Sequence, residues 1–419
     1  QELILTKIPG DIDPCTGKQG SLTTIFSVWN AMVGTGLLTI PWAFSQSGLA
    51  FGLLLTFIAF LISFQTQYFV MVTAGRDSDY TTTMQKTFGA RGWYAGMVTF
   101  ILVLTVPIVL YTQLLAQTLY PILKLVFEHQ GLIAAPSTPP SASQGIGNLE
   151  MDFSQFSYSY TCIIVFVALM LLGQLRDQSV FVKINTFGVV FTIVIISFIF
   201  YMGIHGLRTQ HFNYDLYKER PAKGSSVAAE SFGAGDPTIF MVSMGYPHLL
   251  GILGGGYYLH NISIPIYKNS KQPKNNLRDI FLGYFLVFLS YSICGVLGYY
   301  GFQQPEVFGE NVQIQQNFLN MFDLYYMPAV FVRVCTFFQL LAATALIFAC
   351  QRGQILQFLT GSQDTDSPFA NFLVSFGILI GPLILAVVYP HVGRLAGILG
   401  AFGGFLVIYL LPTLTYLKQ

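Results

Sequence analysis

Residues 29–42 read WNAMVGTGLLTIPW, and residues 249–265 read LLGILGGGYYLHNISIP. Both stretches are apolar, and glycine interrupts each of them, at Gly34 and Gly36 in the first and at Gly254–Gly256 in the second. A membrane helix that unwinds exposes backbone N–H and C=O groups, which a bilayer tolerates only where they line a cavity. Two interrupted segments at corresponding places in the halves of a chain are typical of secondary transporters, and they predict where a ligand binds.

The composition places this chain in a membrane. Hydrophobic residues make up 53% of its 419 residues and charged residues 9%, against roughly 25% charged residues in an ordinary soluble domain. A membrane-spanning helix needs about 20 apolar residues. Ten segments qualify, at residues 22–47, 49–74, 93–127, 158–175, 179–207, 238–267, 277–302, 325–359, 368–389 and 392–417.

The ten predicted spans divide into two groups of similar length. Five fall in residues 22–207 and five in residues 238–417. We therefore predict an all-α integral membrane protein with ten transmembrane helices, arranged as a 5+5 inverted repeat in which helices 1 and 6 are broken. In this interpretation residues 1–21 are an N-terminal segment and residues 208–237 form a long outer loop.

The distribution of charged residues predicts how the chain is oriented in the membrane, and the net charge limits the kinds of partner. Lys and Arg gather mainly on the side that holds the N-terminus, which favours a cytoplasmic N-terminus, or one in the matrix if the membrane is mitochondrial. The net charge of +1 argues against nucleic acid as a partner. The chain begins at Gln1 rather than Met, so we expect an N-terminal region, with any targeting signal, to be missing or processed.

The interruption in the first span suits a carboxylate. A half-helix that begins near Leu37 points free N–H groups and the positive end of its dipole at whatever fills the gap. Asn30, one turn earlier, offers a carbonyl oxygen to a cation. The alternative is that Gly34 and Gly36 only allow close helix packing, as small residues do in membranes. The second interrupted span argues against that alternative.

The sixth span is predicted to complete the site. Unwound carbonyls at Gly254–Gly256 suit a substrate ammonium group. His260, at membrane depth, is either a proton-coupling residue or a hydrogen-bonded packing residue. The predicted substrate-binding residues are Asn30, Ala31, Met32, Gly34, Thr35, Gly36, Gly254, Gly255 and Gly256.

The acidic residues limit the substrate. All nineteen Asp and Glu residues map to loops or span ends, so we expect no carboxylate inside the bundle. A cationic side chain would then lack a counter-ion, and a proton relay based on acids is disfavoured. The predicted substrate is therefore a net-neutral zwitterion. Arg333 and Arg352, near the ends of the eighth span, are interpreted as structural anchors.

Enzyme motifs are absent from the sequence. It has no phosphate-cradling P-loop, no clustered Cys/His metal set and no Gly-x-Ser-x-Gly nucleophile motif. We therefore predict that the protein is not an enzyme and that it carries no cofactor, with sodium as the one candidate ion.

Residues 29–42, followed by Ser45–Gly48, resemble the first helix of the amino acid/auxin permease family. Within that family the chain is similar to the sodium-coupled neutral amino acid transporters, especially the lysosomal arginine-sensing branch. The resemblance covers about residues 20–417 and implies a LeuT-like (APC) fold, alternating access, and an amino acid bound between the first, sixth and eighth spans. The other motifs that match in order and spacing are Val182–Asn185 with Gly188, His260–Asn261, Lys268–Asp279, Gln316–Leu319, and Arg333 followed by Gln339.

Two departures from the family bear on sodium and on span number. Family members place a sodium-binding hydroxyl on the eighth span, but the aligned residue here is Ala342, with Thr344 two residues later. Asn30 matches a residue tied to sodium in the family. Asn30 and Thr344 are therefore the candidate sodium ligands. Asn30 alone would not make a sodium site, because one ligand is not enough. The family also has an eleventh span, whereas this chain stops at Gln419 after the tenth.

Taken together, these features favour a transporter of neutral amino acids that works by alternating access. The alternative is a transporter fold retained as a sensor or as a non-transporting subunit of a larger membrane complex. The expected partners are a small amino acid and the lipid bilayer. The resemblance implies a lysosomal or vacuolar membrane, with the mitochondrial inner membrane and the plasma membrane as alternatives.

Overall fold

A computed structural model describes most of the chain, and its regular structure is helical. The described residues are 20–34, 36–74, 80–132, 153, 156–174, 188–209, 242–260, 263, 270–302, 314–361 and 367–418. The elements in chain order are α1 (Ser21–Val33), α2 (Gly36–Ser47), α3 (Leu49–Ala74), α4 (Tyr80–His129), α5 (Tyr158–Gly173), α7 (Gly188–Thr209), α9 (Tyr246–Gly256), η2 (Pro273–Asn275), α11 (Asn276–Phe302), η3 (Phe318–Met321), α13 (Met327–Thr360), α14 (Pro368–Val388), α15 (Val392–Gly404), η4 (Phe405–Leu410) and α16 (Leu411–Lys418).

Most of the predicted spans correspond to helices of the required length. Among the described residues, six of these helices and the continuous run Val392–Lys418 of α15, η4 and α16 are long and apolar enough to cross a membrane, and the bent pair α1 and α2 makes an eighth candidate. Helix α5 is apolar but shorter, and α9 has 11 residues. Segments next to α5 and α9 lie outside the described residues. The count of ten helices and the 5+5 inverted repeat therefore stay predictions.

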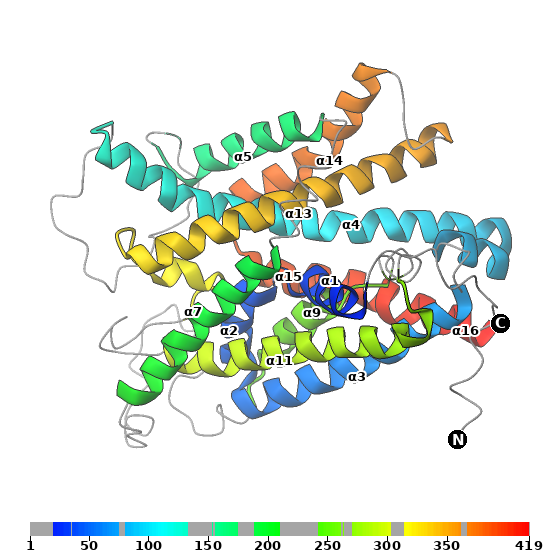
Figure 1. The fold of residues 1–419 in the computed structure, drawn as a ribbon. Helices are drawn as coiled ribbons and strands as arrows, with labels where there is room; N and C mark the ends of the chain where they lie inside the picture. Colours follow the sequence, from blue (N-terminus) through cyan, green and yellow to red (C-terminus); the bar gives the residue numbers. More distant parts are fainter. Residues whose placement is uncertain are drawn as a thin grey trace.

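The long helices run roughly side by side (Figure 1). Helix α4 packs along α13 and α14, and α11 packs along α7 and α3. The interrupted helices lie among them, because α1 and α2 contact α11 while α9 packs against α15 and α2. The glycine-containing helices α2 and α9 are therefore neighbours inside the bundle.

Large apolar side chains cover the outside of the bundle. Leu54, Phe57 and Leu61 on α3 are exposed, as are Phe372 and Leu373 on α14. A soluble monomer rarely shows contiguous apolar surface of this kind, whereas the hydrocarbon core of a bilayer solvates it. These faces of α3 and α14 therefore point toward lipid.

The first span bends sharply between α1 and α2. The two helix axes differ by 57°, and Gly34, which ends α1, has φ 20° and ψ −128°. Glycine adopts positive φ without the steric penalty that a side chain brings, which explains its presence at the bend. The interruption that the sequence predicts at this glycine is present in the structure.

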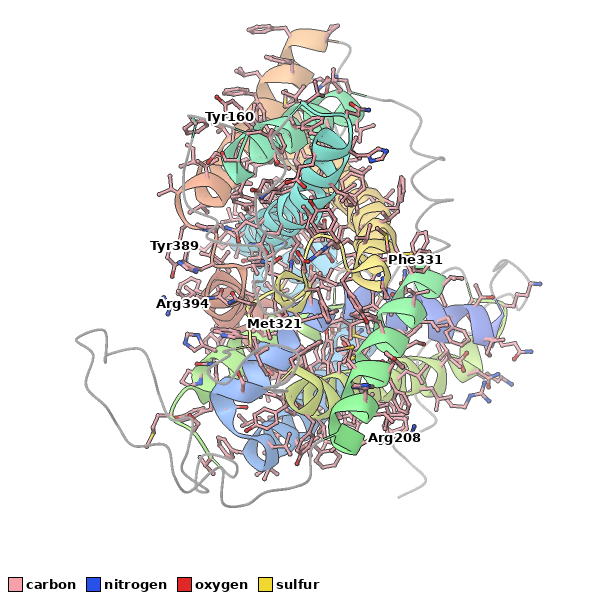
Figure 2. The ribbon with its side chains drawn as sticks, turned by 90° about the vertical axis from the view of Figure 1, so that its left-hand side faces the viewer. Tyr160, Arg208, Met321, Phe331, Tyr389 and Arg394 are labelled. Carbon is pink, nitrogen blue, oxygen red and sulfur yellow. The ribbon has the colours of Figure 1, made fainter. Side chains whose placement is uncertain are left out.

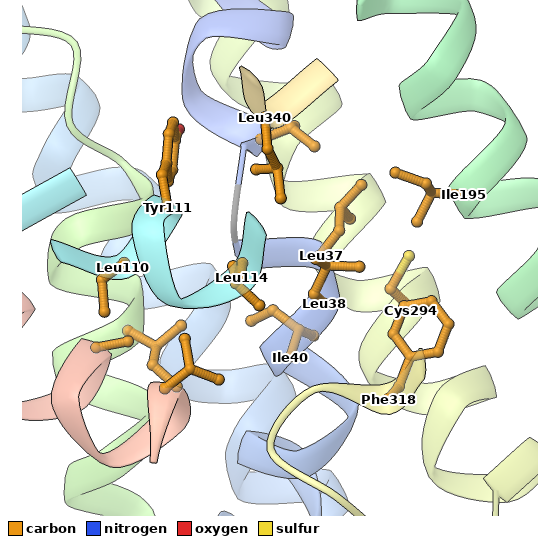
Figure 3. Close-up of a cluster of buried hydrophobic side chains, with 14 of the residues drawn as sticks. Leu37, Leu38, Ile40, Leu110, Tyr111, Leu114, Ile195, Cys294, Phe318 and Leu340 are labelled. Atoms are coloured by element: carbon orange, nitrogen blue, oxygen red, sulfur yellow. The ribbon is translucent and has the colours of Figure 1, made fainter. Parts of the chain in front are cut away.

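The second half of this span is held in the apolar core. Leu37, Leu38 and Ile40 of α2 belong to one buried cluster with Leu114 of α4 and Leu340 of α13 (Figure 3). Protein interiors are packed as densely as organic crystals, so these side chains leave α2 little freedom to shift. The N-terminal turn of α2 is therefore held in a defined place beside the bend.

Glycines let α9 and α15 touch backbone to backbone. A Cβ at Gly251 would overlap the carbonyl group of Gly397, and a Cβ at Gly400 would overlap that of Gly251. A Cβ at Gly404 would lie 2.5 Å from the carbonyl oxygen of Gly254. Small residues are the usual means of such close approach between membrane helices. Helix α9 is thus docked on α15 by its glycine face.

Candidate functional site

The hydroxyl group of Tyr291 joins the ends of the two interrupted helices. Tyr291, on α11, is fully buried. Its Oη donates to the carbonyl oxygen of Met32 at 3.1 Å and lies 3.3 Å from that of Gly256. Met32 is in the last turn of α1 and Gly256 is the last residue of α9. Carbonyls in a last helical turn have no N–H partner within the helix, so this hydroxyl lies between two helix ends that each need a donor.

Two of the predicted site glycines make room for that hydroxyl. A Cβ at Gly36 would lie 2.5 Å from Tyr291 Oη, and a Cβ at Gly256 would lie 2.8 Å from it. Both distances are too short for non-bonded atoms, so a larger residue at either position would clash with the tyrosine. The structure therefore brings Met32, Gly36 and Gly256 together around one point.

A second tyrosine lies at the bend itself. Tyr111, on α4, is buried, and its Oη is 2.5 Å from the position of a Cβ at Gly34. Figure 3 shows its ring next to the junction of α1 and α2. Sequence reasoning missed both Tyr111 and Tyr291. The one available signal was that a buried phenol hydroxyl needs a partner, and it is weak in a chain with 23 tyrosines.

The expectation that Gly254–Gly256 are unwound is wrong. All three residues belong to α9, and the helix ends after them, where Tyr257 N–H donates to Leu253 and Tyr258 N–H to Gly255. Each glycine has a different neighbour. Gly254 is packed against α15, Gly255 is exposed, and Gly256 faces Tyr291. The reason is that close packing on α15 stabilises helical backbone up to Gly256, so only the last carbonyl reaches the site.

Asn30 points toward α7 and α13. Its Oδ1 accepts a hydrogen bond from Thr192 Oγ1 at 3.2 Å, and Thr192 Oγ1 accepts one from Gln339 Nε2 at 2.8 Å. Gly188 leaves space for this arrangement, because a Cβ there would lie 2.9 Å from Asn30 Nδ2. Three positions from separate sequence motifs, Asn30, Gly188 and Gln339, thus lie close together. The hydrogen bonds of Asn30 and Gln339 with Thr192 join α1 to α7 and α13.

The remaining predicted residues are distributed around these contacts. Ala31 is exposed and Met32 is buried, whereas Thr35 lies outside the described residues. Thr344, the other candidate sodium ligand, is fully buried and donates its hydroxyl proton to the Leu340 carbonyl at 2.6 Å. That contact is the usual one for a threonine inside a helix.

One expectation about buried charge needs correction. Asp279 lies in the first turn of α11, at a span end as predicted, but it is fully buried. Its Oδ1 accepts from Arg278 Nη2 at 2.8 Å. The neighbouring arginine allows this burial because it supplies the opposite charge. His260 is fully buried as well, with Nε2 3.0 Å from Thr66 Oγ1, and both interpretations of it, proton coupling and packing, stay predictions.

Arg333 is not at the lipid boundary. It is fully buried on α13 and donates to the carbonyls of Leu319, Phe322 and Asp323 at 2.9, 2.8 and 3.3 Å. The loop that carries η3 folds over this arginine and removes it from solvent. Arg352, near the other end of α13, donates to the Gly173 carbonyl at the end of α5.

The same loop connects to α15. The Oε1 atom of Gln316 accepts from the backbone N–H groups of Gly393 and Arg394 at 2.8 and 3.2 Å, which satisfies donors at the start of α15. In Figure 2, Met321 of η3 lies between Arg394 of α15 and Phe331 of α13. This loop therefore closes one end of the bundle by hydrogen bonds to two helices.

Comparison with known proteins agrees with this architecture. A solved structure described as the inward facing conformation of Mhp1 superposes with a TM-score of 0.54 over 95% of this chain and 77% of that chain, at 14% identity. At this identity the likeness concerns the fold alone. Among curated proteins, the sodium-coupled neutral amino acid transporter 9 homolog of Caenorhabditis elegans is 24% identical over 98% of this chain and 70% of its own length.

A second relative is similar over the same extent. Neutral amino acid transporter 9 of Xenopus tropicalis is 26% identical over 96% of this chain and 75% of its own length. Both relatives are named as transporters rather than enzymes, and they confirm the resemblance drawn from the motifs. The model of the family described as transmembrane amino acid transporter protein matches residues 17–419. With its interrupted first helix and lipid-facing exterior, the chain belongs to this transmembrane amino acid transporter family.

Proposed function

We propose that this protein moves a neutral amino acid across a membrane by alternating access, and that the amino acid binds where α1, α2 and α9 meet. One observation carries the proposal. The carbonyls of Met32 and Gly256 and the first residue of α2, Gly36, all lie beside the same point, which Tyr291 Oη occupies in this structure.

An amino acid has the two groups that complement such a point. Its ammonium group would donate to the helix-end carbonyls of Met32 and Gly256. Its carboxylate would accept from the N–H groups of the first turn of α2, where the helix dipole is positive. In transporters with discontinuous helices, half-helix N-termini point at anionic substrate groups, and free carbonyls at helix ends coordinate cations. Thr35, outside the described residues, and the exposed Ala31 and Gly255 complete the proposed lining.

The charge inventory favours a neutral side chain on the substrate. Among the described buried side chains, Asp279 is the only acid, and it is paired with Arg278. A cationic substrate side chain entering the bundle would therefore lack a counter-ion from these residues, and burying an unpaired charge is expensive. Because its motifs resemble those of the lysosomal arginine-sensing branch, we propose a lysosomal or vacuolar membrane as the site of action.

The test is uptake by proteoliposomes that contain the purified chain. Radiolabelled alanine, leucine, glutamine, lysine and glutamate are offered with sodium or choline outside, and with or without a pH step. We expect saturable uptake of at least one of the three neutral amino acids and none of lysine or glutamate. The Gly34→Leu protein, inserted equally well, should show background uptake. Equal uptake by both proteins would contradict the proposed site, and no uptake at all would contradict transport.

A second candidate function is a sensor or a non-transporting subunit of a larger complex. The observation that favours it is that tyrosine hydroxyls already fill the space beside Gly34, Gly36 and Gly256. In that case the protein would bind an amino acid in detergent and yet fail to exchange internal for external label in proteoliposomes. Exchange at a rate above that of Gly34→Leu would exclude this candidate.

A further inference from the structure

We infer that Tyr291 is an internal competitor of the substrate's ammonium group. Its hydroxyl contacts the carbonyl oxygens of Met32 and Gly256, and an amino acid has to break these contacts in order to bind. The inference rests on the proposed function, because it describes how the same site treats its ligand.

The hydroxyl group of Tyr291 cannot fully satisfy both carbonyl oxygens, those of Met32 and Gly256. A phenol hydroxyl carries one proton, yet two carbonyl oxygens face Tyr291 Oη, at 3.1 and 3.3 Å. Both distances are longer than the roughly 2.7–2.8 Å usual for O–H···O bonds. An ammonium group brings three N–H donors, and its charge makes each hydrogen bond stronger. The two carbonyls are therefore better satisfied by an ammonium group than by Tyr291.

The tyrosine is held in place by its ring. Tyr291 is fully buried, and its ring packs edge-on against Tyr257 with centroids 5.7 Å apart. Gly36 and Gly256 lack the Cβ atoms that would exclude its hydroxyl. The ring cannot swing freely, so loss of the hydroxyl contacts requires the ends of α1 and α9 to move away from α11. Tyr291 thus favours the arrangement in which the two helix ends are drawn together.

The chain offers a matched control on the same helix. Tyr284 lies two turns before Tyr291 on α11, is fully buried, and stacks on the same partner ring, Tyr257, with centroids 6.1 Å apart. Its hydroxyl donates to the Tyr257 carbonyl at 3.3 Å. Tyr284 therefore has the same chemistry and burial as Tyr291, but its acceptor is not one of the two carbonyls at the proposed site.

The experiment measures binding to the full chain in nanodiscs. Tritiated alanine, leucine and glutamine are titrated against the wild type, Tyr291→Phe and Tyr284→Phe. Tyr291→Phe removes the competing hydroxyl and should lower the Kd of the amino acids that bind about fivefold to tenfold. A change of this size corresponds to the net contribution of roughly one hydrogen bond. Tyr284→Phe should change the Kd less than about twofold. The empty Tyr291→Phe protein should melt at a lower temperature than the wild type, and the amino acid should raise that temperature more than it does in the wild type.

A ligand analogue separates competition for hydrogen bonds from simple blocking of space. 4-Methylpentanoate, which is leucine without its amino group, competes with the label in each protein. The gain in Tyr291→Phe should be confined to ligands with an ammonium group, so the affinity for 4-methylpentanoate should not rise. An equal gain for this analogue would overturn the inference, because the hydroxyl would then act only by its volume.

Three further outcomes are decisive. If the wild type binds an amino acid and Tyr291→Phe binds it equally or more weakly, the inference fails and the proposed function stands. If Tyr291→Phe cannot be purified even with amino acid present, the hydroxyl serves folding and the inference fails as well. If neither the wild type nor either variant binds any of the three amino acids, the proposed function itself fails.

Discussion

At the scale of single residues, the site depends on glycine, because tyrosine hydroxyl groups occupy the space that a Cβ atom would fill. Gly34 faces the Tyr111 hydroxyl, and Gly36 and Gly256 face that of Tyr291. Gly255 differs, since a Cβ there would only touch Gly400 at an ordinary 3.5 Å. The predicted glycines are therefore unequal, and substitutions as small as a methyl group can tell them apart.

Gly36→Ala should reduce uptake about tenfold or more. The added Cβ would lie 2.5 Å from Tyr291 Oη and 2.9 Å from its Cζ, and the ring is too tightly packed to yield. Overpacking costs about 1–3 kcal/mol, and 1.4 kcal/mol corresponds to about a tenfold change. The measurement is initial uptake rate in proteoliposomes at equal protein content.

Gly377→Ala is the control for that substitution, because nothing lies within 4 Å of a Cβ at this position on α14. It should leave uptake unchanged. A Gly36→Ala protein as active as Gly377→Ala would show that the contact between Gly36 and Tyr291 has no bearing on transport.

At the scale of elements, α9 is positioned by α15 rather than by its own sequence. Its glycine face lies against Gly397, Gly400 and Gly404, and this docking keeps the end of α9 next to the end of α1. Helix propensity alone would disfavour a helix with three consecutive glycines, each about 1 kcal/mol worse than alanine. Close packing with a neighbour outweighs that preference.

Gly400→Ala should destabilise the protein by about 1–3 kcal/mol through overpacking. The new Cβ would overlap the Gly251 carbonyl, and backbone atoms of a docked helix cannot rotate away as a side chain can. The expected result is a lower melting temperature in detergent, followed by fluorescence-detected size-exclusion chromatography after heating.

The matched control lies three residues further along the same helix. In Gly403→Ala the new Cβ would touch only Val106 Cγ2 at 3.5 Å and Val103 Cγ2 at 3.8 Å, both ordinary contact distances, so its stability should stay within about 0.5 kcal/mol of the wild type. If both variants melted alike, backbone contact between α9 and α15 would not be the reason for the loss.

At the scale of the whole molecule, sodium binding depends on how many spans contribute oxygen ligands to the ion. Hard cations need several oxygen atoms. Asn30 Oδ1 already accepts from Thr192, Thr344 donates to its own helix, and position 342 is a buried alanine. Although one relative is named as sodium-coupled, these contacts support only a weak role for sodium in this chain.

Replacement of sodium by choline should therefore change uptake less than about threefold, a difference of under about 1 kcal/mol. Ala342→Thr, which restores a hydroxyl at the aligned position, should increase the dependence on sodium. Steep sodium dependence in the wild type, lost in Thr344→Ala, would instead assign the ion to Thr344 and would contradict the alignment at Ala342.

The sequence by itself determined the membrane class, most of the spans, the bend at Gly34 and the family. These features follow from local properties: apolar length, composition, and the tolerance of glycine for positive φ. The transporter class was predicted from two glycine-interrupted stretches; the structure has the bend at Gly34, whereas α9 stays helical through Gly256. The proposed roles of the site residues remain predictions for the experiments above.

Only the tertiary structure decided which groups meet. It extended α9 through Gly256, buried Asp279 beside Arg278, enclosed Arg333 under the η3 loop, and placed the Tyr291 hydroxyl between Met32 and Gly256. None of these contacts is local in sequence, apart from the Asp279 pair. The physical reason is that burial and helix-end hydrogen bonds depend on which neighbour fills the space, and a tyrosine distant in sequence supplies the donor that two helix ends lack.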